Sequence, residues 1–137
     1  LQTSFAHRLA LAVIYYSPAQ FLFWNERLGE DHYRPELEFW KDLPTVWDQT
    51  MFLSGEIGES AVVARRNGDL WYVGGITNTN ARSLTLDCSF LGKGKFEATI
   101  YQDGKDGSVE ISRKRVSSKS VLDLRNLSVG SSWRILA

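Results

Sequence analysis

The sequence predicts a mainly β fold, in which two α-helices precede an antiparallel β-sandwich of about eight strands with Greek-key-like connections. From Thr45 onward, short runs of β-branched and aromatic residues recur between turn residues. The segments SLTLD and VEISRKRV also alternate apolar and polar residues, the period of a strand with one buried face. The residues before Pro44 instead carry helix start and stop signals. We therefore divide the chain into residues 1–44, which are helical, and residues 45–137, which form the β-sandwich.

The first expected helix covers residues 3–16 of the segment TSFAHRLALAVIYYSPAQFLFW. Thr3 or Ser4 can cap its start, and Pro18 disfavours helical geometry at Ser17. Apolar residues from Leu9 onward run around most of its circumference, a pattern typical of a helix buried in a large protein. This helix is therefore expected to have belonged to a larger body.

Two other interpretations of this segment fit less well. A membrane-spanning helix needs about 20 mostly apolar residues, and the uninterrupted run here covers only residues 9–16. A signal peptide could use His7 and Arg8 as its basic part, but the chain opens on Leu1 without an initiator Met. The apolar residues 21–24 would also follow any plausible cleavage point. We expect no membrane association.

The segment RPELEFWKDLP predicts a short second helix. Pro35 suits the first helical position, Glu36 suits the positive end of the helix dipole, and Pro44 ends the helix. Phe39, Trp40 and Leu43 fall on one face, where they can pack against a neighbouring element.

The β region contains eight candidate strands separated by turn signals. Asn67-Gly68 predicts a tight hairpin because both residues tolerate positive φ. Further turns are expected at residues 54–55, 92–94, 103–104 and 129–131. The expected strands are 46–53, 60–66, 70–77, 83–87, 95–102, 108–115, 120–124 and 133–136.

Composition excludes several classes of function. The 137 residues include 16 basic and 16 acidic side chains, so no net charge favours nucleic acid or an anionic membrane. Cys88 is the single cysteine, so no intrachain disulfide can form, and we expect it to pack as a small apolar side chain. With His7 and His32 as the only histidines, no Cys/His zinc site can be assembled either.

Two possible catalytic or metal sites are weak. Asp48, Glu56 and Glu59 flank the first strands and could supply the carboxylate pair of a glycosidase, but Glu56 and Glu59 lie in a turn where solvated acids are expected. The segment of residues 103–107, DGKDG, faintly resembles a calcium loop, but Lys105 occupies the third ligand position. We expect a hairpin turn there. The sequon at residues 126–128, Asn-Leu-Ser, is also a weak signal alone.

The tryptophans raise the alternative of a carbohydrate-binding module, since flat aromatic faces can stack on sugars. In DLWYVGGIT both faces of the strand are apolar, so Trp71 is expected in the core. A sugar-binding sandwich would need Trp47, Trp71 or Trp133 exposed. The full set is Trp24, Trp40, Trp47, Trp71 and Trp133.

Several stretches taken together resemble the C-terminal end of glycoside hydrolase family 97, the bacterial α-glucosidases and α-galactosidases. The segment SFAHRLALAVIYYSPAQFL is similar to the last barrel helix of that family. Four motifs follow in the family's order and spacing: Pro-Thr-x-Trp-Asp-x-Thr at 44–50, Gly-x-Ile-Gly-Glu at 55–59, Ala-Arg-Arg at 64–66 and Ile-Tyr-x-Asp-Gly at 100–104. The resemblance covers most of the chain but is loose over the last thirty or so residues.

The resemblance implies that the two helices are left over from a (β/α)8 barrel and that the sandwich is a non-catalytic domain that packs on and stabilises it. The family's catalytic acids and calcium-binding glutamates precede Leu1, so we assign no catalytic, cofactor or metal residue here and predict that the chain is inactive alone. The parent enzyme would be periplasmic or secreted. Both α-glucosidase and α-galactosidase activities stay open, although Tyr16 and residues 21–24 are closer to the retaining, α-galactosidase-like branch.

Without its barrel, the first helix would expose Leu9, Leu11, Val13 and Ile14 to water. An apolar patch of this size is unusual on a monomer and tends to find a partner. We expect the chain either to self-associate through residues 5–24 or to fold the helix back onto its own β domain with Phe39 and Trp40.

Overall fold

The computed structural model describes residues 5–15, 38–41, 43–78, 82–103, 109–127 and 130–136. Two helices, α1 (Phe5–Ile14) and α2 (Glu38–Lys41), precede the strands in the described chain. A short 3-10 helix, η2 (Cys88–Leu91), follows the fourth strand. The strands are β1 (Gln49–Glu56), β2 (Ser60–Asn67), β3 (Leu70–Thr77), β4 (Arg82–Asp87), β5 (Lys95–Asp103), β6 (Val109–Ser117), β7 (Val121–Leu127) and β8 (Gly130–Leu136).

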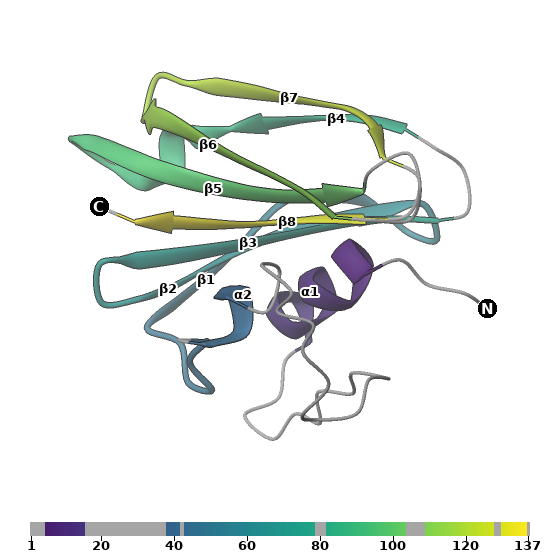
Figure 1. The fold of residues 1–137 in the computed structure, drawn as a ribbon, viewed down its shortest axis with the longest axis horizontal. Coiled ribbons are helices and arrows are strands. Elements are labelled where there is room, and N and C mark those ends of the chain that lie inside the picture. The colour runs from purple at the N-terminus through teal and green to yellow at the C-terminus, as the bar shows by residue number, and fades with distance from the viewer. Residues whose placement is uncertain are drawn as a thin grey trace, which may run out of the picture.

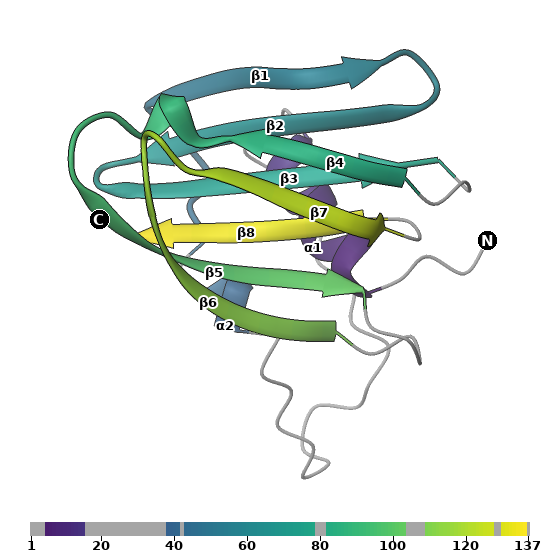
Figure 2. The same cartoon turned by 90° about the horizontal axis from the view of Figure 1, so that it is seen from above.

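The strands form two antiparallel sheets. The larger sheet has the order β1-β2-β3-β8-β5-β6, and β4 pairs with β7 in the smaller one. The pairs are nested around the consecutive strands β5 and β6: β5 pairs with β6, β4 with β7, and β3 with β8. This nesting moves the chain between the sheets and confirms the predicted sandwich with Greek-key-like connections. The small sheet covers one face of the large sheet, and the helices lie on the other (Figures 1 and 2).

The main core lies between the two sheets. Trp71 is 5% exposed there, and its ring meets that of Phe90 at a centroid distance of 5.0 Å. Cys88, on η2, is fully buried in the same core. The cluster of buried side chains is Val62, Ala64, Trp71, Val73, Leu86, Cys88, Leu91, Phe96, Ala98, Ile100, Val116 and Leu122.

Strand β3 is covered on both faces, as its apolar pattern predicted. Trp71 and Val73 face the small sheet, whereas Tyr72 lies in a second core with α1. Gly74 lets the helix approach closely, because a Cβ atom there would lie 2.8 Å from the carbonyl oxygen of Ala10. Helix α1 is therefore folded back onto the β domain, one of the two predicted outcomes.

Some predicted boundaries were wrong. Residues 46–48 precede β1, because Trp47 turns toward the helices and Asp48 bonds to the β2–β3 hairpin. The first turn falls at residues 57–59, since residues 54–56 pair with β2 around a bulge. Strand β8 begins at Gly130 because it pairs along its length with β3.

Several predictions fall outside the described residues: the helix ends near Thr3 and Tyr16, the helix start at Pro35, and the segment 21–24. Within the described part of the chain, no helix is long and apolar enough to cross a bilayer.

Candidate functional site

The helix-facing side of the large sheet holds a second apolar cluster, which we call the helix–sheet interface: Leu9 and Val13 of α1, Phe39 of α2, Tyr72 of β3 and Tyr101 of β5. The Phe39 ring meets the Tyr72 and Tyr101 rings edge-on, at centroid distances of 5.4 and 5.3 Å. Such edge-to-face contacts add to the free energy of burial. Both helices thus pack on the sheet through an apolar core that is separate from the core between the two sheets. The side chain of Trp40, expected beside Phe39, is not among those described.

Arg65 ties the end of α1 to β2. Its side chain is 3% exposed, and its guanidinium donates hydrogen bonds to the carbonyl oxygens of Tyr15 at 3.1 Å and Ile14 at 3.3 Å. These oxygens belong to the negative end of the helix dipole, where a cation is favoured. The guanidinium also lies 5.7 Å from the ring centroid of Trp47. Arg65 therefore caps the helix and anchors the residues that lead into β1.

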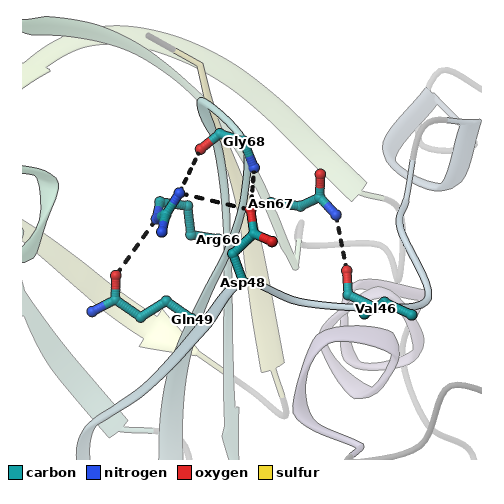
Figure 3. Close-up of polar contacts among 6 residues, drawn as sticks. All are labelled: Val46, Asp48, Gln49, Arg66, Asn67 and Gly68. Carbon is teal, nitrogen blue, oxygen red and sulfur yellow. Dashed lines mark hydrogen bonds and ion pairs between the residues drawn. The ribbon is translucent and has the colours of Figure 1, made fainter.

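A polar cluster joins those residues to the β2–β3 hairpin (Figure 3). The Asp48 carboxylate accepts a hydrogen bond from the Gly68 amide at 2.8 Å and lies 3.7 Å from the Arg66 guanidinium. Asn67 donates its side-chain amide to the carbonyl oxygen of Val46 at 2.9 Å. Gly68 has a φ of 58°, the positive value expected for this turn. Asp48 therefore has a structural role in this hairpin.

Among the acids considered for catalysis, Asp48 lies apart from Glu56 and Glu59, which flank a single turn. Asp48 precedes β1, whereas Glu56 and Glu59 lie at its far end and in the following turn. Eight residues of strand separate the two ends by roughly 26 Å, much farther than a glycosidase carboxylate pair. Among the residues that the structure describes, no three His, Cys, Asp or Glu side chains are placed to share a metal ion.

The remaining candidates lie in or near the sandwich. Asp103 ends β5, which pairs antiparallel with β6, and the other residues of the DGKDG segment lie outside the described part of the chain. Burial, and secondarily the charge of Asp87, raises the pKa of the Cys88 thiol, consistent with an unreactive core side chain. His32 and Trp24 lie outside the described residues, and Asn126 is placed only by its backbone in β7.

The tryptophans do not form an exposed sugar platform in the described structure. Trp71 is buried, and Trp47 is half-buried with its ring 5.5 Å from that of Tyr72. Trp133 is described by its backbone alone, which pairs with Val73 and Ile100.

Arg65, in the Ala-Arg-Arg motif, is the residue whose role the sequence did not reveal. The alternation of β2 did predict that its side chain lies on the same face of the strand as Val63.

Comparison with known families decides the identity of this fold. A family model described as "Glycosyl-hydrolase 97 C-terminal, oligomerisation" matches residues 46–132. The chain belongs to this family. The prediction of a C-terminal domain of a family 97 glycosidase is confirmed.

Curated relatives of this family 97 domain are enzymes of greater length. A retaining alpha-galactosidase from Bacteroides thetaiotaomicron is 45% identical over 100 residues, which cover 71% of this chain and 14% of the relative. A probable retaining alpha-galactosidase from Streptomyces bingchenggensis is 39% identical over 71 residues, covering 52% of this chain and 11% of the relative. The matched part of this chain thus spans only 14% of the length of the first relative and 11% of the length of the second.

Solved structures extend the match beyond the strands. A glycoside hydrolase family 97 enzyme from Pseudoalteromonas sp. strain K8, in complex with panose, has a TM-score of 0.82 and 31% identity, covering 98% of this chain and 23% of its own. A beta-arabinopyranosidase has a TM-score of 0.76 at 31% identity, covering 97% of this chain and 21% of its own. Because these matches leave out only a few residues, they take in α1 as well as the sandwich.

Proposed function

We propose that this domain packs on, and stabilises, the catalytic (β/α)8 barrel of a longer α-glycosidase. The observation that carries the proposal is the helix–sheet interface. Helix α1 resembles the last barrel helix in sequence, and here it is fixed to the sheet by Phe39, Tyr72 and the Arg65 cap. A barrel helix held so firmly by the sandwich would join the two domains rigidly.

The test compares the longer protein with a version that stops before Thr45. We expect the shortened enzyme to lose thermal stability and, with it, activity after heating. Arg65→Met in the longer protein should reproduce part of this loss, because it removes two hydrogen bonds at the junction. Equal melting temperatures with and without the domain would contradict the proposal.

For the reaction of the longer protein, we propose hydrolysis of α-galactosides with retention of configuration. Support comes from the two curated relatives, at 45% and 39% identity, whose names specify a retaining alpha-galactosidase. An α-glucosidase is the alternative, since a structural relative at 31% identity was solved with panose. Hydrolysis of aryl α-galactosides beside aryl α-glucosides, with the product anomer followed by NMR, distinguishes them.

This chain alone is expected to be inactive, because the resemblance assigns the catalytic acids to residues that precede Leu1. Hydrolysis of an aryl α-galactoside by the purified chain, abolished by substituting one of its own acids, would refute this. Calcium would likewise bind outside this chain, and the longer protein would be a bacterial periplasmic or secreted enzyme of carbohydrate metabolism. Fractionation of expressing cells tests its location.

A further inference from the structure

The β2–β3 hairpin contains a chemically labile pair of residues. Asn67-Gly68 is the one Asn-Gly pair in the sequence, and both residues are exposed. In such a pair the backbone nitrogen of the glycine can attack the side-chain amide carbon of the asparagine, because glycine has no Cβ atom to hinder the approach. The turn that joins β2 to β3 is therefore also a place where the chain can modify itself.

The modification needs water as its only co-reactant, and nothing is oxidised or reduced. The Gly68 nitrogen loses its proton to solvent and bonds to the Cγ atom of Asn67. The Cγ–Nδ2 bond breaks, and the leaving NH2 group takes up a proton to depart as ammonia. Water then opens the cyclic imide at either of its carbonyl carbons, which gives an aspartate or an isoaspartate. The isoaspartate adds one carbon atom to the backbone of the hairpin.

Contacts of the folded hairpin oppose this ring closure (Figure 3). The Gly68 N–H donates to the Asp48 carboxylate at 2.8 Å, and a negative charge beside the amide disfavours the loss of its proton. The Asn67 side-chain amide donates to the carbonyl oxygen of Val46 at 2.9 Å, which holds the leaving group in place. Asn67 also pairs with Leu70, and the extended backbone of a strand residue keeps the next nitrogen away from Cγ. The hairpin must open before the reaction can start.

We propose that Asn67 is a site of spontaneous deamidation that the folded hairpin holds unreactive, and that its conversion loosens the residues that lead into β1. An aspartate or isoaspartate at this position has no amide to donate to the Val46 carbonyl oxygen, and it adds a negative charge to the cluster that contains Asp48. Trp47 lies between these two residues and packs against Tyr72, so conversion also weakens a contact of the helix–sheet interface. The inference concerns this chain alone and does not depend on a barrel.

Incubation of the full chain at mildly alkaline pH, followed by peptide mass spectrometry, measures the conversion of Asn67. We expect slow conversion in the native chain and much faster conversion in urea. Asp48→Ala should speed native conversion about three- to tenfold, the range that follows from losing one typical hydrogen bond. The matched control is Gln49→Ala, since Gln49 is the next residue but bonds to the Arg66 guanidinium, and this variant should convert at the wild-type rate. Native conversion as fast as in urea, or equal rates in the two variants, would overturn the inference.

A second experiment keeps the inference testable if Asp48→Ala folds poorly. Asn67→Asp reproduces the aspartate product, and the Asp48 N–H, which donates to the Arg66 carbonyl oxygen at 2.8 Å, should exchange with solvent about three- to tenfold faster in this variant than in the wild type. Asn78→Asp is its control, because it removes a comparable side-chain bond to the Gly58 carbonyl oxygen in another turn and should leave that exchange unchanged. Unchanged exchange in Asn67→Asp, or equal changes in both variants, would show that conversion does not loosen these residues and would overturn the proposal.

Discussion

Arg65 is a charged side chain that the fold removes almost completely from water. Its guanidinium is balanced by the two carbonyl oxygens at the end of α1 and by the Trp47 ring. Its neighbour Arg66 is partly exposed and bonds to the β2–β3 hairpin instead. Arg65 and Arg66 are adjacent on β2 and point to opposite faces of the sheet. Substitutions of the two arginines can therefore be compared directly.

Arg65→Met should lower the free energy of unfolding by about 2–4 kcal/mol, because two charge-assisted hydrogen bonds are lost and two carbonyl groups lose their partner. Arg65→Lys should lower the free energy of unfolding by less than Arg65→Met does, since the ammonium keeps the charge but cannot donate to both carbonyl oxygens at once as the planar guanidinium does. Arg66→Met, at a partly exposed site, should cost less than about 1 kcal/mol. Urea denaturation followed by tryptophan fluorescence measures all three, and equal losses for the two arginines would contradict the capping role.

Cys88 has a pKa above its ordinary value of 9.0, first because it is buried and second because of Asp87. In the native chain the thiol should react with an aromatic disulfide reagent far more slowly than in the urea-unfolded chain. Above the ordinary thiol pKa the unfolded state loses a proton that the native state keeps. Stability should therefore fall as the pH rises through that range, and Cys88→Ala should remove this part of the decline. Equal thiol reaction rates in the native and unfolded chains would argue against burial.

At the scale of elements, the contact between α1 and β3 depends on Gly74. A methyl group there would lie 2.8 Å from the Ala10 carbonyl oxygen and 3.1 Å from the Val13 Cβ atom. Because one of these neighbours is backbone, the helix itself must move to make room.

Gly74→Ala should destabilise the fold by about 1–3 kcal/mol, the usual cost of overpacking, and should speed amide hydrogen exchange in α1. Gly68→Ala is the control, since it meets no atom but imposes a φ of 58° on a residue with a side chain. Both should lower stability, and only the first should loosen α1. Unchanged exchange in α1 would show that the helix does not rely on this close approach.

At the scale of the molecule, the small sheet, the large sheet and the helices form three layers (Figure 1). The middle layer is apolar on both faces, so removing either outer layer would expose a core. Leu9 and Val13 of α1 alone account for about 3–6 kcal/mol of burial.

A chain that starts at Arg34 should therefore be less stable than the intact chain and should associate nonspecifically through Tyr72 and Tyr101. Sedimentation and thermal unfolding of both lengths are the measurements. A truncated chain that stays monomeric and equally stable would show that α1 contributes little to the fold.

The sequence alone determined where the strands lie to within a few residues and where the tightest hairpin lies, because alternation and turn residues act over a few positions. It also determined that β3 is covered on both faces, from the uninterrupted apolar run around Trp71. The separation of Asp48 from Glu56 and Glu59 was less evident, since the three acids are close in sequence and only an extended β1 holds Asp48 apart from the other two.

Tertiary structure alone decided what lies across from each strand. The pairings of β3 with β8 and of β4 with β7 join residues far apart in the chain, and no local pattern specifies them. The same holds for Arg65, whose hydrogen-bond partners lie 50 and 51 residues away in the sequence. The alternation of residues predicts the face of a strand to which a side chain points. Which residues that side chain contacts depends on segments that come together only when the whole chain folds.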